Sequence, residues 1–128
     1  MVRGVGVDIV DVRRIERLLE RYGRAFEGRV FTQAEVAYCR RMARPGLHFA
    51  GRFAAKEAFY KALPESCQAL AGWRAVETLA GPGGRPRIEV TAPQLAAALA
   101  GAGVDRVHVS ISHEHENCVS VVLMEGTR

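Results

Sequence analysis

The sequence predicts an α+β fold, in which an antiparallel sheet packed with helices forms a single domain. Runs of alternating, β-branched residues stand near both ends of the chain, and runs with helical periodicity are grouped mainly between them. Strands and helices in separate runs are typical of α+β domains with antiparallel sheets. The length of 128 residues suits one domain (residues 1–128) whose core needs no disulfide or structural metal.

The chain begins with a strand that leads directly into a helix. Residues 2–10 alternate and are rich in valine and isoleucine, which predicts a strand. Helical spacing begins after Asp11, a favourable N-cap residue, and continues to residue 22. The residues expected on the inner side of this helix are Val12, Ile15, Leu18, Leu19 and Tyr22.

Two more helices are expected before the middle of the chain. Thr32-Gln-Ala-Glu35 is a capping box, which predicts a helix that continues to about residue 43. Pro45-Gly46 is expected to break this helix. A third helix then covers residues 47–63 and is ended by Pro64.

The second half of the chain predicts four strands and one helix. The first two strands are joined by the turn Gly81-Pro-Gly-Gly84. An alanine-rich helix then begins at Pro93, is capped by Thr91 and ends at Gly101 or Gly103. The four strands are expected over residues 73–80, 86–91, 106–113 and 117–124.

Composition is that of an ordinary globular protein, with 48% hydrophobic and 25% charged residues. No segment approaches the roughly 18 apolar residues that a membrane span requires. The amino terminus has no signal-peptide pattern, so a cytoplasmic protein without a membrane partner is expected. Cys39, Cys67 and Cys118 form no CxxC pair and are expected to be reduced thiols.

Positive charge is concentrated in the first half of the chain. Residues 1–62 contain 13 Arg and Lys against 7 Asp and Glu, whereas residues 63–128 contain 5 against 7. The first half is therefore expected to face an acidic partner. Charge alone leaves three classes open, namely a nucleic acid, an anionic cofactor and an acidic protein.

The predicted helix over residues 47–63 combines a core-like apolar pattern with charged groups. Arg52, Lys56 and Lys61 accompany a single carboxylate, Glu57. A carboxylate beside several cations suits a site that holds a divalent metal and a polyphosphate together. The alternative is a solvated helix face with a weak Glu57–Lys61 ion pair.

A second acid, Asp8, stands near the end of the first, otherwise apolar strand. A carboxylate buried alone there would be costly and would take up a proton. Asp8 therefore either caps the following helix or meets Glu57 at a shared cation. Two carboxylates, with water and phosphate oxygens in the remaining positions, are a usual environment for Mg²⁺.

Other motifs carry weaker signals. Gly4-Val-Gly6 is not followed directly by a helix, so it does not form a dinucleotide-binding fingerprint. His113 and His115 have no third metal ligand nearby in sequence, which favours a histidine that contacts phosphate or lines a strand end. His48 and His108 are expected to be structural. No serine or cysteine has a clear base partner, so an enzyme would take its nucleophile from the substrate.

Together, these residues resemble the holo-acyl-carrier-protein synthase family, the short bacterial type of 4′-phosphopantetheinyl transferase. The resemblance spans most of the chain and is most specific in its first and middle blocks. The matching blocks are Gly4-Val-Gly-Val-Asp-Ile-Val-Asp-Val-Arg-Arg-Ile15, Phe31-Thr-Gln-Ala-Glu35, Ala50-Gly-Arg-Phe-Ala-Ala-Lys-Glu-Ala-Phe-Tyr-Lys-Ala-Leu63 and Val109-Ser-Ile-Ser-His113.

The resemblance implies a 4′-phosphopantetheinyl transferase-like fold and a Mg²⁺-dependent reaction. The enzyme would transfer 4′-phosphopantetheine from coenzyme A to a serine of apo acyl carrier protein and release adenosine 3′,5′-bisphosphate. The implied catalytic residues are Asp8, Glu57 and Lys61, of which Asp8 and Glu57 hold the metal. The implied coenzyme-binding residues are Arg52, Lys56, Lys61 and His113. The base that accepts the serine proton is either Glu57 or a water molecule on the metal.

The resemblance also implies partners. The family forms homotrimers with each site at a subunit boundary, so His113 can come from a neighbouring chain. Acyl carrier proteins are strongly acidic, and a basic row on the second predicted element gives them a docking surface. This row consists of Arg14, Arg17, Arg21 and Arg24.

Two segments depart from the family pattern. Pro64–Gly72 replaces the usual glycine-rich turn, and Glu114–Asn117 is unusually acidic for the neighbourhood of a polyphosphate. Two alternatives remain at this level, a basic nucleic-acid-binding module and an inactive coenzyme-A-binding protein of the same fold. Aromatic residues make up only 7% of the chain and no nucleic-acid-binding motif is present, which disfavours the first alternative.

Overall fold

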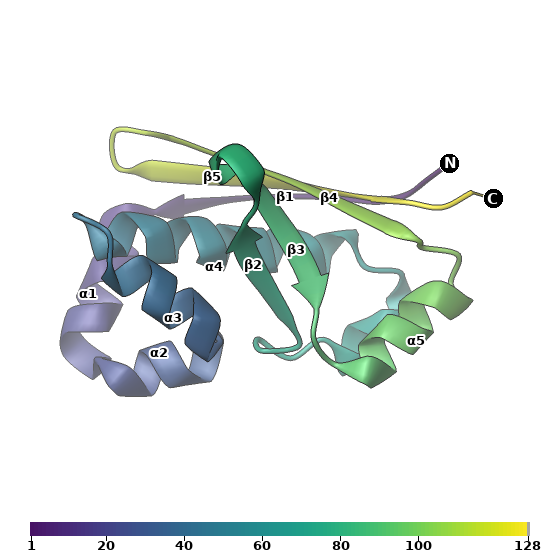
Figure 1. Cartoon of the computed structure of the whole chain (residues 1–128), viewed down its shortest axis with the longest axis horizontal. Helices are drawn as coiled ribbons and strands as arrows, with labels where there is room; N and C mark the ends of the chain where they lie inside the picture. The colour runs from purple at the N-terminus through teal and green to yellow at the C-terminus, as the bar shows by residue number, and fades with distance from the viewer. Residues whose placement is uncertain (128) are drawn as a thin grey trace.

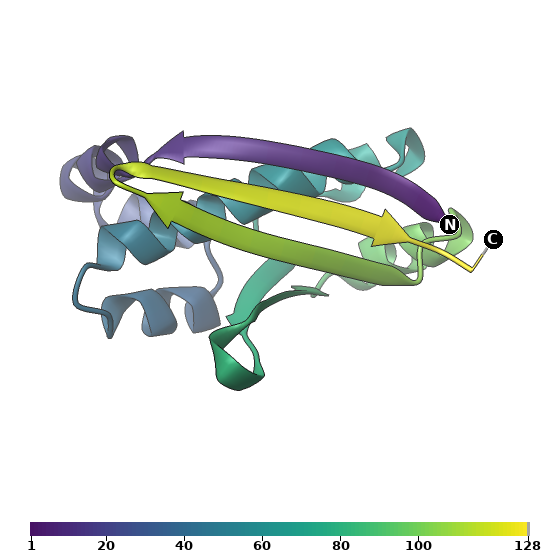
Figure 2. The same ribbon diagram turned by 90° about the horizontal axis from the view of Figure 1, so that it is seen from above.

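Three long strands form an antiparallel sheet in the order β1-β5-β4 (Figures 1 and 2). The computed structural model describes residues 1–127. The strands are β1 (Val2–Asp11), β4 (Arg106–Glu114) and β5 (Asn117–Glu125). Because the last strand lies in the middle, it pairs with the first strand, and both termini lie at the same end of the sheet (Figure 2).

The long helix α4 (Pro45–Ala62) lies directly against the inner face of this sheet (Figure 1). Two glycines of β1 make the close approach possible. A Cβ atom on Gly4 would stand 2.0 Å from the carbonyl oxygen of Ala62, and one on Gly6 would stand 1.9 Å from that of Ala58. The Gly4-Val-Gly6 motif therefore has a packing role, because any side chain there would push α4 away from β1.

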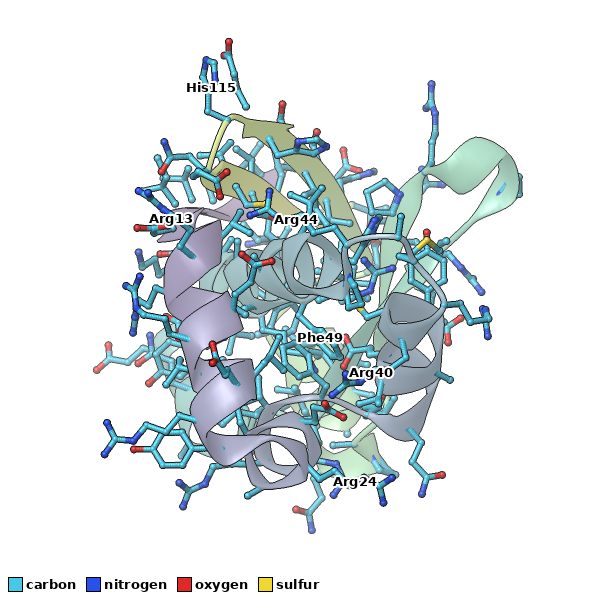
Figure 3. The ribbon with its side chains drawn as sticks, turned by 90° about the vertical axis from the view of Figure 1, so that its left-hand side faces the viewer. Arg13, Arg24, Arg40, Arg44, Phe49 and His115 are labelled. Carbon is cyan, nitrogen blue, oxygen red and sulfur yellow. The ribbon has the colours of Figure 1, made fainter. Side chains whose placement is uncertain are left out.

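Three short helices surround the amino-terminal part of α4 (Figures 1 and 3). They are α1 (Val12–Tyr22), α2 (Arg24–Val30) and α3 (Gln33–Arg40). Phe49 of α4 is fully buried among them, with its ring centroid 4.9 Å from that of Phe31. This aromatic contact joins α4 to the segment between α2 and α3 and anchors the helical end of the molecule.

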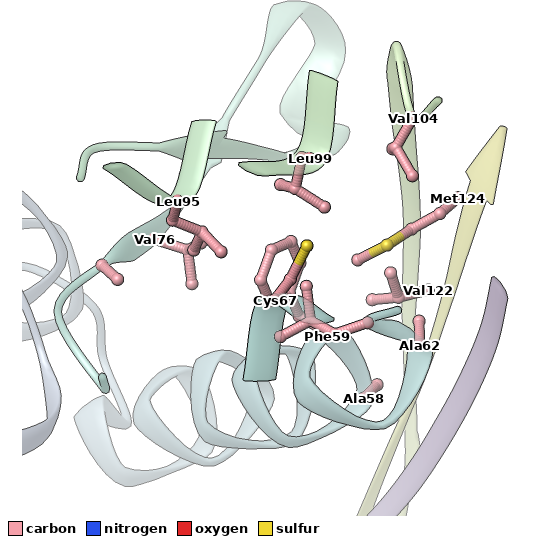
Figure 4. Packing of buried hydrophobic residues seen from close by; sticks show 12 residues of the cluster. Ala58, Phe59, Ala62, Cys67, Val76, Leu95, Leu99, Val104, Val122 and Met124 are labelled. Atoms are coloured by element: carbon pink, nitrogen blue, oxygen red, sulfur yellow. The ribbon is translucent and has the colours of Figure 1, made fainter. Parts of the chain in front are cut away.

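The remaining elements cover the other half of α4. They are the 3₁₀ helix η1 (Glu65–Leu70), the hairpin of β2 (Val76–Ala80) and β3 (Pro86–Val90) with its 3₁₀ turn η2 (Pro82–Gly84), and α5 (Pro93–Gly101). Figure 4 shows the hydrophobic cluster of this half of the molecule, in which Phe59 of α4 meets Leu95 and Leu99 of α5 and Met124 of β5.

Local capping signals in the sequence are confirmed. The Asp11 carboxylate accepts a hydrogen bond from the Arg13 amide at 2.9 Å and caps α1. Thr32 and Glu35 form the reciprocal capping box of α3. No helix within residues 1–127 is both long enough and apolar enough to span a membrane.

Several boundaries differ from the sequence prediction. No local sequence signal marked α2, and α3 ends at Arg40 rather than at residue 43. Pro45 begins α4 instead of separating two helices, because proline fits the first helical position, where no amide donor is needed. β2 begins at Val76 rather than at residue 73.

Two side-chain predictions were also wrong. Thr91 does not cap α5, because its hydroxyl donates to the Arg74 carbonyl at 2.8 Å. Tyr22 is exposed rather than inward-facing. The structural role expected for His108 fits its position, 3.0 Å from a Glu125 carboxylate oxygen.

Candidate active site

The structure brings Asp8 of β1 and Glu57 of α4 together at the free edge of the sheet. Lys61 links the two elements, because its Nζ donates to Asp8 Oδ1 at 3.0 Å and to the Val7 carbonyl at 3.2 Å. The pKa of Glu57 is raised, first by burial and then by the negative charge of Asp8. Two acids 49 positions apart in the sequence therefore act on one another in the fold.

Strand alternation explains the position of Asp8. Gly6 and Val10 are buried on the face of β1 toward α4, and Asp8 lies between them on the same face. Because Gly6 brings β1 against Ala58, the neighbouring Glu57 on α4 comes close to this strand. Asp8 does not cap α1, since Asp11 has that role, so the capping alternative for Asp8 is wrong.

Arg14 of α1 supplies a second positive charge at this edge. Its charge, like that of Lys61, opposes the rise in the pKa of Glu57. The guanidinium carbon of Arg14 lies 6.0 Å from the ring centroid of Phe53 on α4. Two carboxylates thus face two cations in a setting that is partly open to solvent.

This donor set fits a magnesium ion. Within residues 1–127, no group of three or more His, Cys, Asp or Glu side chains is arranged to hold a metal. Asp8 and Glu57 alone therefore offer hard oxygen ligands here. Mg²⁺ commonly binds one or two carboxylates and completes its shell with water and substrate phosphates, so these two acids are sufficient protein ligands. The alternative reading, a Glu57–Lys61 ion pair, is not found among residues 1–127, where Lys61 pairs with Asp8 instead.

A cavity of about 370 Å³ opens beside Glu57. Its walls include Tyr60, Gly72, Trp73 and Val76, which come from α4 and from the segment that leads into β2. The lining is mainly apolar, and Glu57 is its one carboxylate. The cavity can therefore accept an apolar or aromatic group of a ligand whose charged part lies at Asp8 and Glu57.

Lys56 also borders this cavity, but its ammonium group is buried. Lys56 Nζ lies 2.8 Å from Glu35 Oε1 and donates to the carbonyl oxygens of Trp73 at 2.7 Å and Val76 at 2.8 Å. Burial lowers the pKa of Lys56, although the Glu35 charge opposes this effect. A phosphate-facing role for Lys56 remains a prediction, and these contacts favour a different role.

Arg52 of α4 and His113 of β4 do not belong to the group of side chains around Glu57. Arg52 is buried, with its guanidinium carbon 4.2 Å from the ring centroid of Tyr38 on α3. The pKa of His48 is lowered first by burial and then by the charges of Arg52 and His113. Arg52 and Glu57 are five positions apart on α4, so their side chains point about 140° away from one another around the helix axis. Within one chain, Arg52 and His113 therefore form a basic group separate from Glu57.

The arginine row predicted on α1 is exposed. Arg14, Arg17, Arg21 and Arg24 all reach the surface. Arg44, which the sequence did not single out, fixes the orientation of α1 (Figure 3). Its guanidinium donates to Glu16 of α1 at 2.9 Å and to Glu116 of the β4–β5 turn at 2.7 Å. The acidic Glu114–Asn117 segment thus has a structural partner, which could not be inferred from local sequence.

Trp73 and Glu35 are two further residues that sequence reasoning missed. Glu35 has two tasks, because it completes the capping box of α3 and also pairs with buried Lys56. The capping pattern accounted for the carboxylate and therefore gave no reason to look for a second partner. The one available signal for Trp73 was that it is the sole tryptophan of the chain.

Comparison with known proteins places this geometry in a family. The family model described as the 4′-phosphopantetheinyl transferase superfamily matches residues 4–117. A holo-[acyl-carrier-protein] synthase from Moorella thermoacetica is 44% identical over 124 residues, covering 95% of this chain and 93% of the relative. One from Syntrophus aciditrophicus is 38% identical over 128 residues, covering 100% of this chain and 99% of the relative.

Solved structures agree with the sequence relatives. The crystal structure of holo-[acyl-carrier-protein] synthase from Neisseria meningitidis matches with a TM-score of 0.84 and 32% identity, covering 98% of this chain and 99% of that chain. A Bacillus anthracis synthase in complex with CoA (3′,5′-ADP) matches with a TM-score of 0.79 and 29% identity, covering 99% of both chains. The predicted α+β fold is thereby confirmed, and the chain belongs to the 4′-phosphopantetheinyl transferase superfamily.

Proposed function

We propose that this protein is a holo-[acyl-carrier-protein] synthase that transfers 4′-phosphopantetheine from coenzyme A to a serine of apo acyl carrier protein. The observation that carries the proposal is the meeting of Asp8 and Glu57 beside Lys61. Relatives named for this activity match over nearly the whole chain. Two similar synthases whose structures are complexes with coenzyme A support coenzyme A as the donor substrate.

The reaction forms one phosphorus–oxygen bond and breaks another. The serine oxygen attacks the phosphorus that carries pantetheine, and the pyrophosphate bridge to the nucleotide breaks. Adenosine 3′,5′-bisphosphate leaves, and the serine proton passes to a base. Such a transfer needs mainly positioned reactants and compensation of the charge on phosphate oxygens. Lys61 and Arg14 stand where they can provide part of that compensation.

Asp8 and Glu57 would hold a Mg²⁺ ion in the working enzyme. When bound, the ion would neutralise charge on the coenzyme pyrophosphate. The raised pKa of Glu57 fits this role, because a carboxylate that is costly to ionise beside another acid gains from a nearby cation. Lys61 keeps Asp8 partly compensated when no other cation is present.

A complete site would combine two chains of a homotrimer. Arg52 and His113 are separated from Glu57 within one chain, so they would serve the site of a neighbouring copy. The outer face of the sheet is free of helices (Figure 1) and carries an exposed apolar patch. The patch comprises Val5, Val7, Ile9 and Val121, which are 58%, 55%, 66% and 39% exposed. Covering it with further copies would remove this apolar surface from water.

The acidic carrier protein would dock on α1. The arginine row Arg14, Arg17, Arg21 and Arg24 runs from the edge that holds Glu57 to the start of α2. Arg14 belongs to the arginine row, and its charge also acts on Glu57. A carrier protein bound along α1 would therefore have its serine near Glu57. The expected cytoplasmic location stays a prediction.

Intact-mass spectrometry of an apo carrier protein tests the proposal. Incubation with the enzyme, coenzyme A and Mg²⁺ is expected to add the mass of one phosphopantetheine group. The added mass should be absent with EDTA and return with excess Mg²⁺. An inactive coenzyme-A-binding protein would bind coenzyme A, measured by calorimetry, without the mass gain. Full transfer by the Asp8→Ala or Glu57→Ala variant would contradict the proposed site.

A further inference from the structure

The ammonium group of Lys56 has all of its hydrogen-bonding capacity used inside the protein. An ammonium has three N–H donors, and Lys56 Nζ has three oxygen atoms within 2.8 Å. They belong to Glu35 and to the backbone carbonyls of Trp73 and Val76. The lysine and glutamate side chains are 2% and 0% exposed. In this arrangement no Lys56 donor is left for a phosphate oxygen.

Glu35 is satisfied equally fully. Its Oε1 accepts from the Thr32 amide at 2.9 Å, and its Oε2 accepts from the Thr78 amide at 2.8 Å. The buried pair therefore ties together α3, α4 and the segment that enters β2. Such a pair adds little net stability compared with apolar residues, whereas it can fix one arrangement of the chain.

The arrangement that Lys56 fixes is the wall of the cavity beside Glu57. The carbonyl groups of Trp73 and Val76 are the ones held by Lys56, and both residues line that cavity. The Trp73 ring stacks on Phe53, with centroids 5.1 Å apart and an interplanar angle of 28°. Lys56 thus holds the backbone of Trp73 while Phe53 holds its ring.

We propose that Lys56 is a positioning residue that sets Trp73 as the wall of the coenzyme cavity and does not itself contact a phosphate. This inference rests on the proposed function, because it takes coenzyme A as the ligand. The mainly apolar lining suits an aromatic or aliphatic group of the coenzyme, with its phosphates at the Asp8–Glu57 edge. Lys56 would act on coenzyme binding through Trp73.

The sole tryptophan makes this inference testable without an activity assay, because tryptophan emission reports only the cavity wall. The test variant combines Glu35→Gln with Lys56→Met, so that both buried charges are removed together. Arg87→Met combined with Glu89→Gln serves as the matched control, because it also removes one cation and one carboxylate and this exposed ion pair does not line the cavity. Circular dichroism checks that each variant is folded.

In the double variant, we expect the emission of the free protein to shift to longer wavelength. The dissociation constant for coenzyme A, measured by calorimetry, should rise by about tenfold, because misplacing a supporting residue weakens a preorganised site. Its dependence on salt should stay as in the unmodified protein. The control variant with Arg87→Met and Glu89→Gln should leave both the emission and the dissociation constant unchanged.

A direct phosphate contact would give a different result. The free double variant would then keep its emission spectrum, and its coenzyme affinity would fall together with the salt dependence. That outcome, or unchanged affinity, overturns the inference. Failure of the unmodified protein to bind coenzyme A would instead refute the proposed donor substrate, and the emission shift would remain measurable.

Trp73→Ala keeps the inference testable if the double variant does not fold. It leaves the Lys56–Glu35 pair intact and removes only the wall. We expect the same rise of about tenfold in the dissociation constant for coenzyme A, because the double variant and Trp73→Ala both disrupt the cavity wall at Trp73. A Trp73→Ala variant with unchanged affinity for coenzyme A would show that the wall does not contribute to binding.

Discussion

Lys61 on α4 holds Asp8 on β1, with its Nζ 3.0 Å from Asp8 Oδ1, and Glu57 lies one helical turn before Lys61. The contact joins two elements distant in sequence at the edge where the metal is proposed to bind. The Lys61 side chain is 52% exposed, so the pair is a surface interaction of small energetic weight. Its importance is therefore expected to lie in catalysis and not in stability.

The first prediction concerns Asp8. Asp8→Asn is expected to lower phosphopantetheine transfer by at least about a hundredfold, because the charge of a proposed metal ligand is lost. The free energy of unfolding should fall by no more than about 1 kcal/mol, since only a half-exposed ion pair is removed. Mass-spectrometric rates and urea unfolding measure the two effects. Asp11→Asn is the control on the same strand, and equal activities of the two variants would contradict the assignment.

The second prediction concerns the contact between β1 and α4. Gly6→Ala would place a methyl group 1.9 Å from the Ala58 carbonyl oxygen, so the helix and strand must separate. We expect a loss of about 2–4 kcal/mol in the free energy of unfolding, in the range of overpacked cores and strained backbones. Transfer should fall as well, because Asp8 and Glu57 move apart.

Gly28→Ala is the matched control for this prediction. Gly28 lies within α2, and a Cβ atom there has no neighbour within 4 Å. The substitution should raise the free energy of unfolding by about 0.5–1 kcal/mol through helix propensity. If both glycine variants have similar stability, the close approach of α4 to β1 is not what requires Gly6.

These residues also show which features could be inferred from the sequence. Periodicity, the Asp11 cap and the Thr32–Glu35 capping box act over a few neighbouring residues, so local patterns revealed them. The short helix α2 contains Gly28 and lacks a side-chain cap, and no local signal marked it. A solvated face remained an alternative for the charges of α4, because a buried lysine requires partners that lie elsewhere in the chain.

Lys56 illustrates the last point. Its partners Glu35, Trp73 and Val76 lie 17 to 21 positions away, and two of them contribute backbone carbonyls, which carry no sequence signal. The convergence of Asp8 and Glu57 was one of two alternatives at the level of sequence, because a lone acid in an apolar strand demands a partner, and the family resemblance favoured it. The separation of Arg52 from Glu57 follows from helix geometry, and in the proposed homotrimer Arg52 would serve the site of a neighbouring copy.

The third prediction tests whether each site is shared between copies. Asp8→Ala chains and His113→Ala chains are expected to be inactive by themselves. Mixed trimers produced by co-expression should recover about a quarter of the activity, because in a ring one boundary in four joins an intact Asp8 to an intact His113. Transfer rates of the purified mixed assembly provide the measurement. No recovery in verified mixed trimers would mean that both residues serve the site of one chain.

The fourth prediction concerns carrier-protein docking on α1. Arg17→Glu combined with Arg21→Glu should raise KM for the carrier protein by about tenfold and weaken its dependence on salt, since electrostatic attraction is lost. KM for coenzyme A and the rate at saturating carrier protein should change little. Arg29→Glu is the control, because Arg29 is exposed on α2 outside the row. An equal effect of Arg29→Glu would indicate that overall charge, and not this row, determines docking.

The fifth prediction concerns the buried thiol of Cys39. Burial raises its pKa from 9.0 to about 12, so the thiol is neutral and inaccessible in the folded protein. Iodoacetamide at pH 8 should modify Cys39 only after unfolding, as peptide mass mapping would show. The unfolded thiol ionises above pH 9 while the folded thiol keeps its proton, so the stability from this group is complete below pH 9 and declines as the pH rises toward 12. Cys39→Ala should therefore reduce the loss of unfolding free energy between pH 8 and pH 10.5, and an unchanged loss would show that Cys39 does not cause it.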